Sequence, residues 1–342
     1  MDMVQKKRIK WIDYAKMIGI VLVVFGHALP GCELEKWIYS FHMPLFFFLS
    51  GITLKNDRGY IEYVQKLARR LLVPYCQFSV LWLLYFICEK YLFHEHIELV
   101  NKVIGFFVQW RGTDWQLGLW FLPLLFGAET LVAFIIRQNF KLQVCLVLGV
   151  TGAGFAYAEL VHRTIPWHID AVMIVAPFIY LGYLYKSLLS GKYGESFLQN
   201  SKVTWLLIIF SFIVNISSNA CNVRRLGINV DIYEMRYGNP LLYFLSALSG
   251  IAFVLLVCQK IIGTKDLKVA GWIGRNTLYI YCIHQIIIGC FHHFDAIFLR
   301  LNVKIIWADM LIGIMALILS CLFILIGKQI QKRFRKVYLN LI

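Results

Sequence analysis

The stretch WIDYAKMIGIVLVVFGHALP, residues 11–30, decides the fold, because it is long and apolar enough to cross a lipid bilayer as one helix. It carries two groups that are rare inside such helices, Lys16 and His27. They are eleven residues apart, and at about 100° per residue both side chains leave the same helix face, about 16 Å apart along the axis. Asp13 falls on that face too. Polar groups on the interior face of a membrane helix usually mark a route for a substrate, an ion or a proton, so this face is the first candidate for function.

The chain as a whole has the composition of a membrane protein. Of its 342 residues, 60% are hydrophobic and 15% are charged, whereas about a quarter are charged in soluble proteins. No segment shows the two-residue alternation of a membrane barrel strand, so we expect an all-α polytopic protein with about ten spanning helices. We expect one membrane domain over residues 1–342 and no additional extracytoplasmic domain. The predicted spans lie near 11–30, 38–54, 71–92, 118–136, 142–160, 169–187, 203–217, 240–260, 270–291 and 305–327.

Lysine and arginine residues are distributed unequally between the two sides of these spans. With the N-terminus in the cytoplasm, 22 of the 34 fall in inner segments, 10 in outer segments, and Lys16 and Arg275 within spans. This bias predicts that both termini are cytoplasmic, in a multi-pass protein of the cell membrane surrounded by lipids. It also accounts for the net charge of +15 without a nucleic acid partner, so we expect none.

Cysteines and histidines do not form a metal motif. None of the nine cysteines makes a C-x-x-C pair, and no H-E-x-x-H motif is present, so we expect no metal. Cys32 and Cys221 are both predicted outside and would pair only if the fold brought them together.

The predicted catalytic residues are His27, Lys16, His42 and Asp13. His42 lies one turn into the second predicted span, where it can face His27. A neutral imidazole can accept a proton from an attacking hydroxyl group, which is the task of a general base. A simple hydrogen bond across helices explains His42 equally well. A structural salt bridge between Asp13 and Lys16 explains that pair equally well.

Three basic residues, Lys66, Arg69 and Arg70, are predicted just before the third span at its cytoplasmic edge. They are suited to hold a phosphate through charge-assisted hydrogen bonds, although charge at a cytoplasmic helix end is also the ordinary topological signal. Glu129 is predicted near the middle of the membrane, where a carboxylate is usually paired, and we expect Lys16 or Arg275 as its partner.

Further polar and aromatic residues gather towards the outside and are candidates to bind substrate. For the tryptophans packing is the default interpretation, and for His168 and Asp170 a solvated loop is the favoured one. Thr277, Tyr281 and His284 share one face of the ninth predicted span. The candidate substrate-binding residues are Trp120, Glu129, Trp167, Asp170, Asn239, Tyr281 and His284.

Several short motifs along the chain occur together. They are I-D-Y-A-K at 12–16, V-V-F-G-H at 23–27, Y-S-F-H-M-P-L-F-F-F-L-S-G at 39–51, R-L-L-V-P-Y at 70–75, L-W-F-L-P at 119–123, Y-G-N-P at 237–240 and G-R-N-T-L at 274–278. Together they resemble the acyltransferase 3 family of integral membrane proteins, and more closely its fucose 4-O-acetylase-like branch. The resemblance spans nearly the whole chain.

This resemblance implies an O-acetyltransferase. Such an enzyme transfers acetyl from cytoplasmic acetyl-CoA to a sugar hydroxyl of an envelope glycan or lipid-linked oligosaccharide. In the family an Arg and a His mark the first helix, and Lys16 and His27 occupy those positions here. The family's basic pair associated with CoA matches Lys66 with Arg69 or Arg70. The alternative is a secondary transporter of a sugar or another small solute that uses the same polar residues, which inverted repeats would favour; the sequence shows none.

Overall fold

The computed structural model describes residues 9–92, 94, 96–109, 118–161, 163–189, 201–262, 265–293 and 305–341. Within these residues the chain is almost entirely helical, and the one pairing of β type is an isolated bridge between Asp231 and Arg236. The expected all-α class is therefore confirmed.

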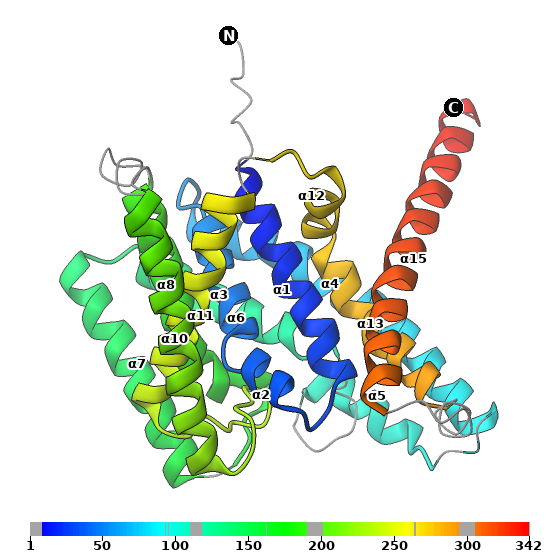
Figure 1. Cartoon of the computed structure of the whole chain (residues 1–342). Helices are drawn as coiled ribbons and strands as arrows, with labels where there is room; N and C mark the ends of the chain where they lie inside the picture. The colour runs from blue at the N-terminus through cyan, green and yellow to red at the C-terminus, as the bar shows by residue number, and fades with distance from the viewer. Residues whose placement is uncertain are drawn as a thin grey trace.

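Figure 1 shows how the helices are arranged in space. In chain order they are α1 (Lys10–Ala28), α2 (Glu33–Tyr39), α3 (His42–Thr53), α4 (Tyr60–Leu92), α5 (Leu99–Val108), α6 (Phe121–Ile135), α7 (Phe140–Leu160), η1 (Pro166–His168), α8 (Ile169–Leu189), α10 (Ser201–Leu226), α11 (Pro240–Val257), η2 (Cys258–Ile262), α12 (Lys268–Arg275), α13 (Thr277–His292) and α15 (Ile305–Leu341).

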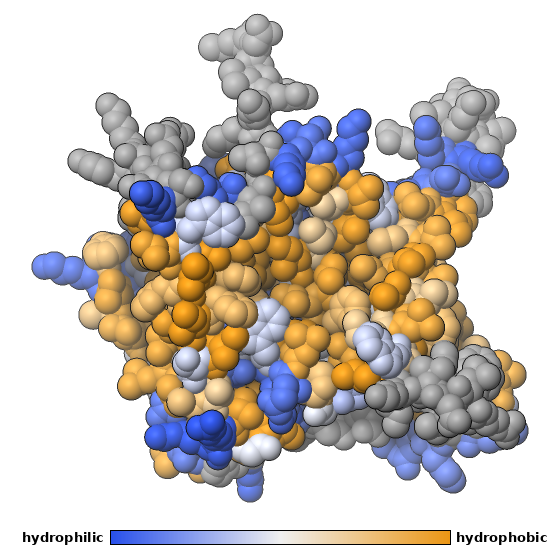
Figure 2. Space-filling view, in the orientation of Figure 1, coloured by the Kyte–Doolittle hydropathy of each residue, from blue (hydrophilic) through white to orange (hydrophobic). Residues whose placement is uncertain are grey.

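Seven helices in the described part of the chain are long and apolar enough to cross a membrane. Hydrophobic side chains cover the middle of the face seen in Figure 2, and hydrophilic ones gather along its upper and lower edges. The first helix begins and the last helix ends on the same side of the bundle (Figure 1). This is the arrangement of a multi-pass membrane protein; the count of about ten spans and the cytoplasmic placement of both ends stay predictions.

Five predicted spans differ clearly from the helices observed. Two helices end later than predicted, since α10 extends to Leu226, beyond the predicted end at 217, and α15 extends to Leu341, beyond 327. The predicted span 38–54 is divided, because α2 ends at Tyr39, Phe41 adopts a non-helical conformation (φ −147°, ψ −15°), and α3 starts at His42. The predicted span 270–291 is divided in the same way at Asn276, between α12 and α13. The third span starts much earlier than residue 71, since α4 begins at Tyr60. The basic residues at 66–70 therefore lie within this helix and not before it, and their position at the cytoplasmic edge of the membrane stays a prediction.

Close backbone contact places α3 at the centre of the bundle. At Gly51 of α3 an added Cβ atom would lie 1.9 Å from the carbonyl oxygen of Ile179, and at Gly182 of α8 it would lie 2.0 Å from that of Phe48. Only glycine permits such an approach, and small residues at helix crossings are typical of membrane bundles. The two glycines thus set the close spacing of α3 and α8.

Candidate active site

Two cavities lie near opposite ends of α1. The inner cavity, of about 280 Å³, has a lining that includes Lys16, Ser50, Arg70, Glu129 and Arg275. The outer cavity, of about 500 Å³, is lined by His27, Tyr39, His42, Trp120, Asp231 and Glu234 among others. The two predicted polar groups of α1 therefore face different cavities, since eleven residues of helix separate them.

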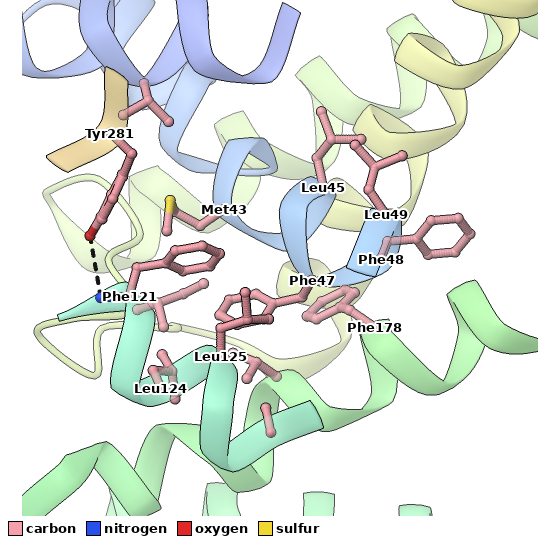
Figure 3. Close-up of a cluster of buried hydrophobic side chains, with 14 of the residues drawn as sticks. Met43, Leu45, Phe47, Phe48, Leu49, Phe121, Leu124, Leu125, Phe178 and Tyr281 are labelled. Atoms are coloured by element: carbon pink, nitrogen blue, oxygen red, sulfur yellow. Dashed lines mark hydrogen bonds between the residues drawn. The ribbon is translucent and has the colours of Figure 1, made fainter. Parts of the chain in front are cut away.

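Met43 and Tyr281 line both cavities and so form a shared wall between them. The Tyr281 hydroxyl accepts a hydrogen bond from the backbone N–H of Phe121, at 3.2 Å, and the two rings lie 5.4 Å apart (Figure 3). Phe121 is the first residue of α6, where the backbone N–H groups have no partner within the helix. Because the hydroxyl oxygen accepts this bond, its own proton remains for donation to another group.

His27 lies at the outer end of α1, with its Nδ1 atom 3.3 Å from the hydroxyl of Tyr39. In the tautomer in which the Nδ1–H group donates to the Tyr39 hydroxyl, Nε2 carries the lone pair that a base needs. The ring of His284 from α13 lies 5.3 Å away, centroid to centroid, and the ring of His42 from α3 lies 4.9 Å from that of Tyr39. The structure thus brings together three imidazoles from three helices, as expected for His27 and His42.

Hydrogen bonds to the backbone fix the orientation of two of these rings. The Nδ1 atom of His42 lies 2.8 Å from the carbonyl oxygen of Ile38, and that of His284 lies 2.8 Å from the carbonyl oxygen of Tyr281. A carbonyl accepts only from a protonated nitrogen, so a neutral ring in this arrangement keeps its lone pair on Nε2. Among the described residues, no group of three His, Cys, Asp or Glu side chains is arranged to hold a metal ion.

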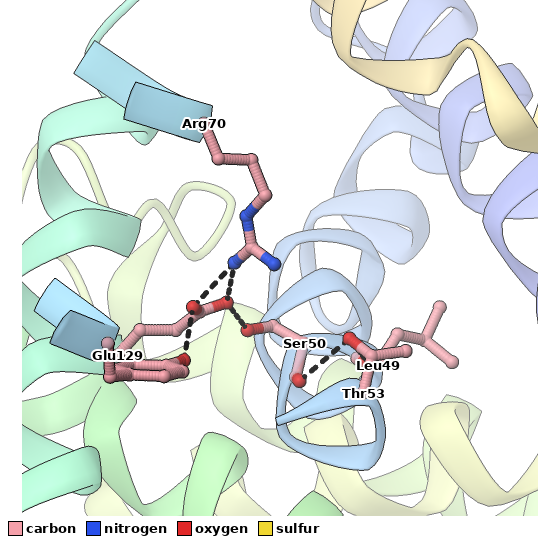
Figure 4. A network of polar contacts seen from close by, with 6 residues as sticks. Leu49, Ser50, Thr53, Arg70 and Glu129 are labelled. Carbon is pink, nitrogen blue, oxygen red and sulfur yellow. Dashed lines mark hydrogen bonds and ion pairs between the residues drawn. The ribbon is translucent and has the colours of Figure 1, made fainter. Parts of the chain in front are cut away.

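Glu129 lies in the wall of the inner cavity and is paired with Arg70 (Figure 4). Arg70 donates through Nη2 to Oε2 at 2.6 Å, Tyr63 donates its hydroxyl to Oε2 at 2.9 Å, and Ser50 donates to Oε1. The carboxylate side chain is only 2% exposed. The packing of α4 against α6 thus brings Arg70 to the carboxylate, while the expected partners Lys16 and Arg275 line the same cavity.

Cations gather around the inner cavity. Lys16, Arg70 and Arg275 all line it, and Arg275 also forms an ion pair with Asp13, with Nη1 and Oδ2 3.8 Å apart. Of the predicted phosphate-binding residues, Arg70 lines this cavity, whereas Lys66 and Arg69 are exposed on α4 outside its lining.

Trp120 and Tyr281 are the predicted substrate-binding residues in the lining of the outer cavity, and the ring of Trp120 lies 5.7 Å from that of Tyr233. Trp167 lines a separate groove with Pro123 and Phe126. Glu129 belongs to the inner cavity, and Tyr281 to the wall between the two.

Asp170 and Asn239 lie outside the lining of both cavities, and each accepts hydrogen bonds from the backbone. Asp170 accepts from the N–H of Ile165 at 2.9 Å, and Asn239 accepts from those of the first turn of α11. Asp170 and His168 are fully buried, so their interpretation as solvated loop residues is wrong. Cys32 and Cys221 are both free thiols.

Tyr39 and Asp231 belong to the outer cavity but were not among the predicted site residues. Asp231 accepts the backbone N–H of Tyr233 at 2.8 Å, and burial raises the pKa of this carboxyl group to about 6. The available signal was weak, since Tyr39 stands in an aromatic run and Asp231 in a polar outer segment.

Comparison with known proteins gives one match. Residues 9–325 match the model of a family described as an acyltransferase domain, and this range includes all the residues of both cavities. No curated protein matches the chain.

Proposed function

Since the chain belongs to the acyltransferase 3 family and is a membrane acyltransferase, we propose that it transfers acetyl from cytoplasmic acetyl-CoA to a sugar hydroxyl of an envelope glycan or lipid-linked oligosaccharide. The observation that carries this proposal is the wall that the two cavities share at Met43 and Tyr281. The donor enters the inner cavity, the acceptor enters the outer cavity, and the thioester and the sugar hydroxyl meet at this wall, where the acetyl group passes from one to the other. The enzyme then works in the cell membrane.

The cations of the inner cavity suit the phosphates of the donor. Lys16, Arg70 and Arg275 surround a space with apolar walls, which fits a charged nucleotide at the mouth and a thin pantetheine arm further in. Lys66 and Arg69 extend the positive charge along the exposed face of α4 and assist the approach of the anionic donor.

The outer cavity suits a sugar. Trp120 and Tyr233 provide aromatic faces, and Asp231 and Glu234 provide carboxylate oxygens that accept hydrogen bonds from sugar hydroxyl groups. Pockets of about 300–1,000 Å³ are usual for small ligands, and this one lies in that range at about 500 Å³.

In a direct transfer, His27 acts as the general base. Its Nε2 atom removes the proton from the sugar hydroxyl, and the sugar oxygen forms a bond to the thioester carbon. The hydroxyl of Tyr281 donates a hydrogen bond to the oxyanion that forms on the carbonyl oxygen. The carbon–sulfur bond then breaks, and the thiolate of CoA takes the proton from the His27 imidazolium. General-base catalysis of this kind is worth roughly 10²–10⁴-fold in rate.

The test uses purified protein in nanodiscs, labelled acetyl-CoA and a candidate lipid-linked glycan. We expect label in an ester on the glycan for the wild type and for His94→Ala, an exposed histidine outside the lining of both cavities. We expect a loss of about 10²-fold or more for His27→Ala. The proposal fails if label never reaches a hydroxyl group while the protein dissipates a sugar gradient in liposomes, because that result identifies a transporter.

A further inference from the structure

His284 is a fully buried residue of α13 with one nitrogen that has no hydrogen-bond partner in the described part of the chain. Its Nδ1 atom lies 2.8 Å from the carbonyl oxygen of Tyr281 and 3.2 Å from that of Ile280, so this side of the ring is bonded to its own helix. Its Nε2 atom is buried and has no hydrogen-bond partner among the described residues. Buried polar atoms are nearly always paired, and an unpaired one in a functional region calls for an explanation.

The surroundings of His284 limit what this nitrogen can do. Because Nδ1 is turned back to the helix, Nε2 is the outward nitrogen, and the ring of His27 lies 5.3 Å away between centroids. The other ring nearby is Tyr281, at 5.9 Å. The Nε2 atom is closed off from the outer cavity, so a substrate in that cavity does not contact it. His284 therefore acts on the reaction only through another side chain, and His27 is the one placed to receive that effect.

We propose that His284 is a positioning residue for the proposed transfer: it holds a lone pair beside His27 and stabilises the positive charge that His27 gains when it removes the hydroxyl proton. This inference rests on the proposed function. His284 neither gains nor loses a proton. The proton stays on His27 until the thiolate of CoA takes it, so the sum of the reaction is unchanged.

An imidazole suits this place better than the carboxylate that orients histidine in soluble hydrolases. A carboxylate buried within the hydrocarbon region carries a full charge at a large cost, whereas a neutral imidazole carries only a dipole. Its lone pair interacts weakly with a neutral neighbour and strongly with a cationic one. The stabilisation therefore appears mainly when charge develops on His27, which is the condition for an effect on rate instead of on binding.

The experiment compares His284→Phe, which keeps a ring but has no lone pair, with His284→Gln, which restores an acceptor oxygen. The same substitution on the same helix, His292→Phe at an exposed position, is the matched control. We expect His284→Phe to lower kcat about 10- to 100-fold with the KM of both substrates unchanged, and to raise the solvent deuterium isotope effect on kcat. His284→Gln recovers part of the loss, and His292→Phe behaves as the wild type.

A second measurement needs neither donor nor acceptor. Diethyl pyrocarbonate adds to a ring nitrogen of histidine through a cationic transition state, and mass spectrometry gives the rate at His27. We expect this rate to fall at least about threefold in His284→Phe and to recover in His284→Gln, at equal thermal stability. An unchanged rate at His27 overturns the inference, whatever the transfer activity. If the rate changes as expected while the wild type transfers no acyl group, the proposed function fails and the role of His284 towards His27 stands.

Discussion

The crossing of α3 and α8 gives a quantitative prediction for Gly51→Ala. The added Cβ atom would lie 1.9 Å from the carbonyl oxygen of Ile179, and real Cβ atoms essentially never approach closer than 3.0 Å. The two helices must therefore separate by about 1.1 Å along this contact. Overpacking of a tight interior costs about 1–3 kcal/mol, and a backbone neighbour that cannot rotate away places this site at the upper end. Alanine returns about 1 kcal/mol through its better helix propensity, so we expect a net loss of about 2 kcal/mol.

Thermal unfolding in nanodiscs, followed by tryptophan fluorescence, measures this loss. Gly149→Ala on α7 is the matched control, because an added Cβ atom at Gly149 meets nothing within 4 Å. We expect a clearly lower midpoint for Gly51→Ala and an equal or higher one for Gly149→Ala. Transfer activity should fall in Gly51→Ala alone, since α3 carries His42 and Met43. Equal midpoints for the two variants would refute the reasoning that backbone contact fixes α3 in place.

Three further predictions concern the cavities. Burial raises the pKa of Asp231 from 3.8 to about 6, so the carboxyl group keeps its proton to higher pH in the folded protein than in the unfolded chain. The free energy of unfolding should therefore fall as pH rises from about 4 to 6. Thermal unfolding across pH 4–7 measures this slope, and Asp231→Asn should flatten it. Glu129→Ala leaves Tyr63 and Ser50 without their shared acceptor and should destabilise the protein by about 3 kcal/mol, and Glu129→Gln should recover part of this loss. Equal thermal unfolding midpoints for the wild type and both variants would contradict this prediction. Arg70→Gln should raise the KM for acetyl-CoA about tenfold or more and Lys66→Gln much less, because Arg70 lines the inner cavity and Lys66 does not. Steady-state kinetics with varied acetyl-CoA measures both values, and equal effects would contradict the placement of the donor in the inner cavity.

The sequence was sufficient for the class of fold and for the first helix. Apolar length marks a membrane helix whatever its neighbours are, so the stretch from 11 to 30 was recognisable without any tertiary information. The helical period placed Lys16 and His27 on one face, and the structure places them on the two cavities. The class of fold and the first helix were predictable because they depend on local properties of the chain alone, whereas a joint role for Lys16 and His27 stays a prediction.

The pairing of side chains between helices was not predictable in this way. Glu129 pairs with Arg70 because α4 lies against α6, and nothing within either segment specifies that neighbour. His168 and Asp170 are polar residues at a predicted span edge, yet the fold buries both. The break at Phe41 escaped detection because an apolar run shows no change in composition where a helix stops and another starts.

The shared wall at Met43 and Tyr281 also matters for the membrane potential. A water-filled tube through the bundle would let ions and protons run down the transmembrane voltage. Here Met43 and Tyr281, with the ring of Phe121 against that of Tyr281, lie between the two cavities. In the proposed transfer only an acetyl group crosses this wall, so the reaction would need no open channel that discharges the membrane.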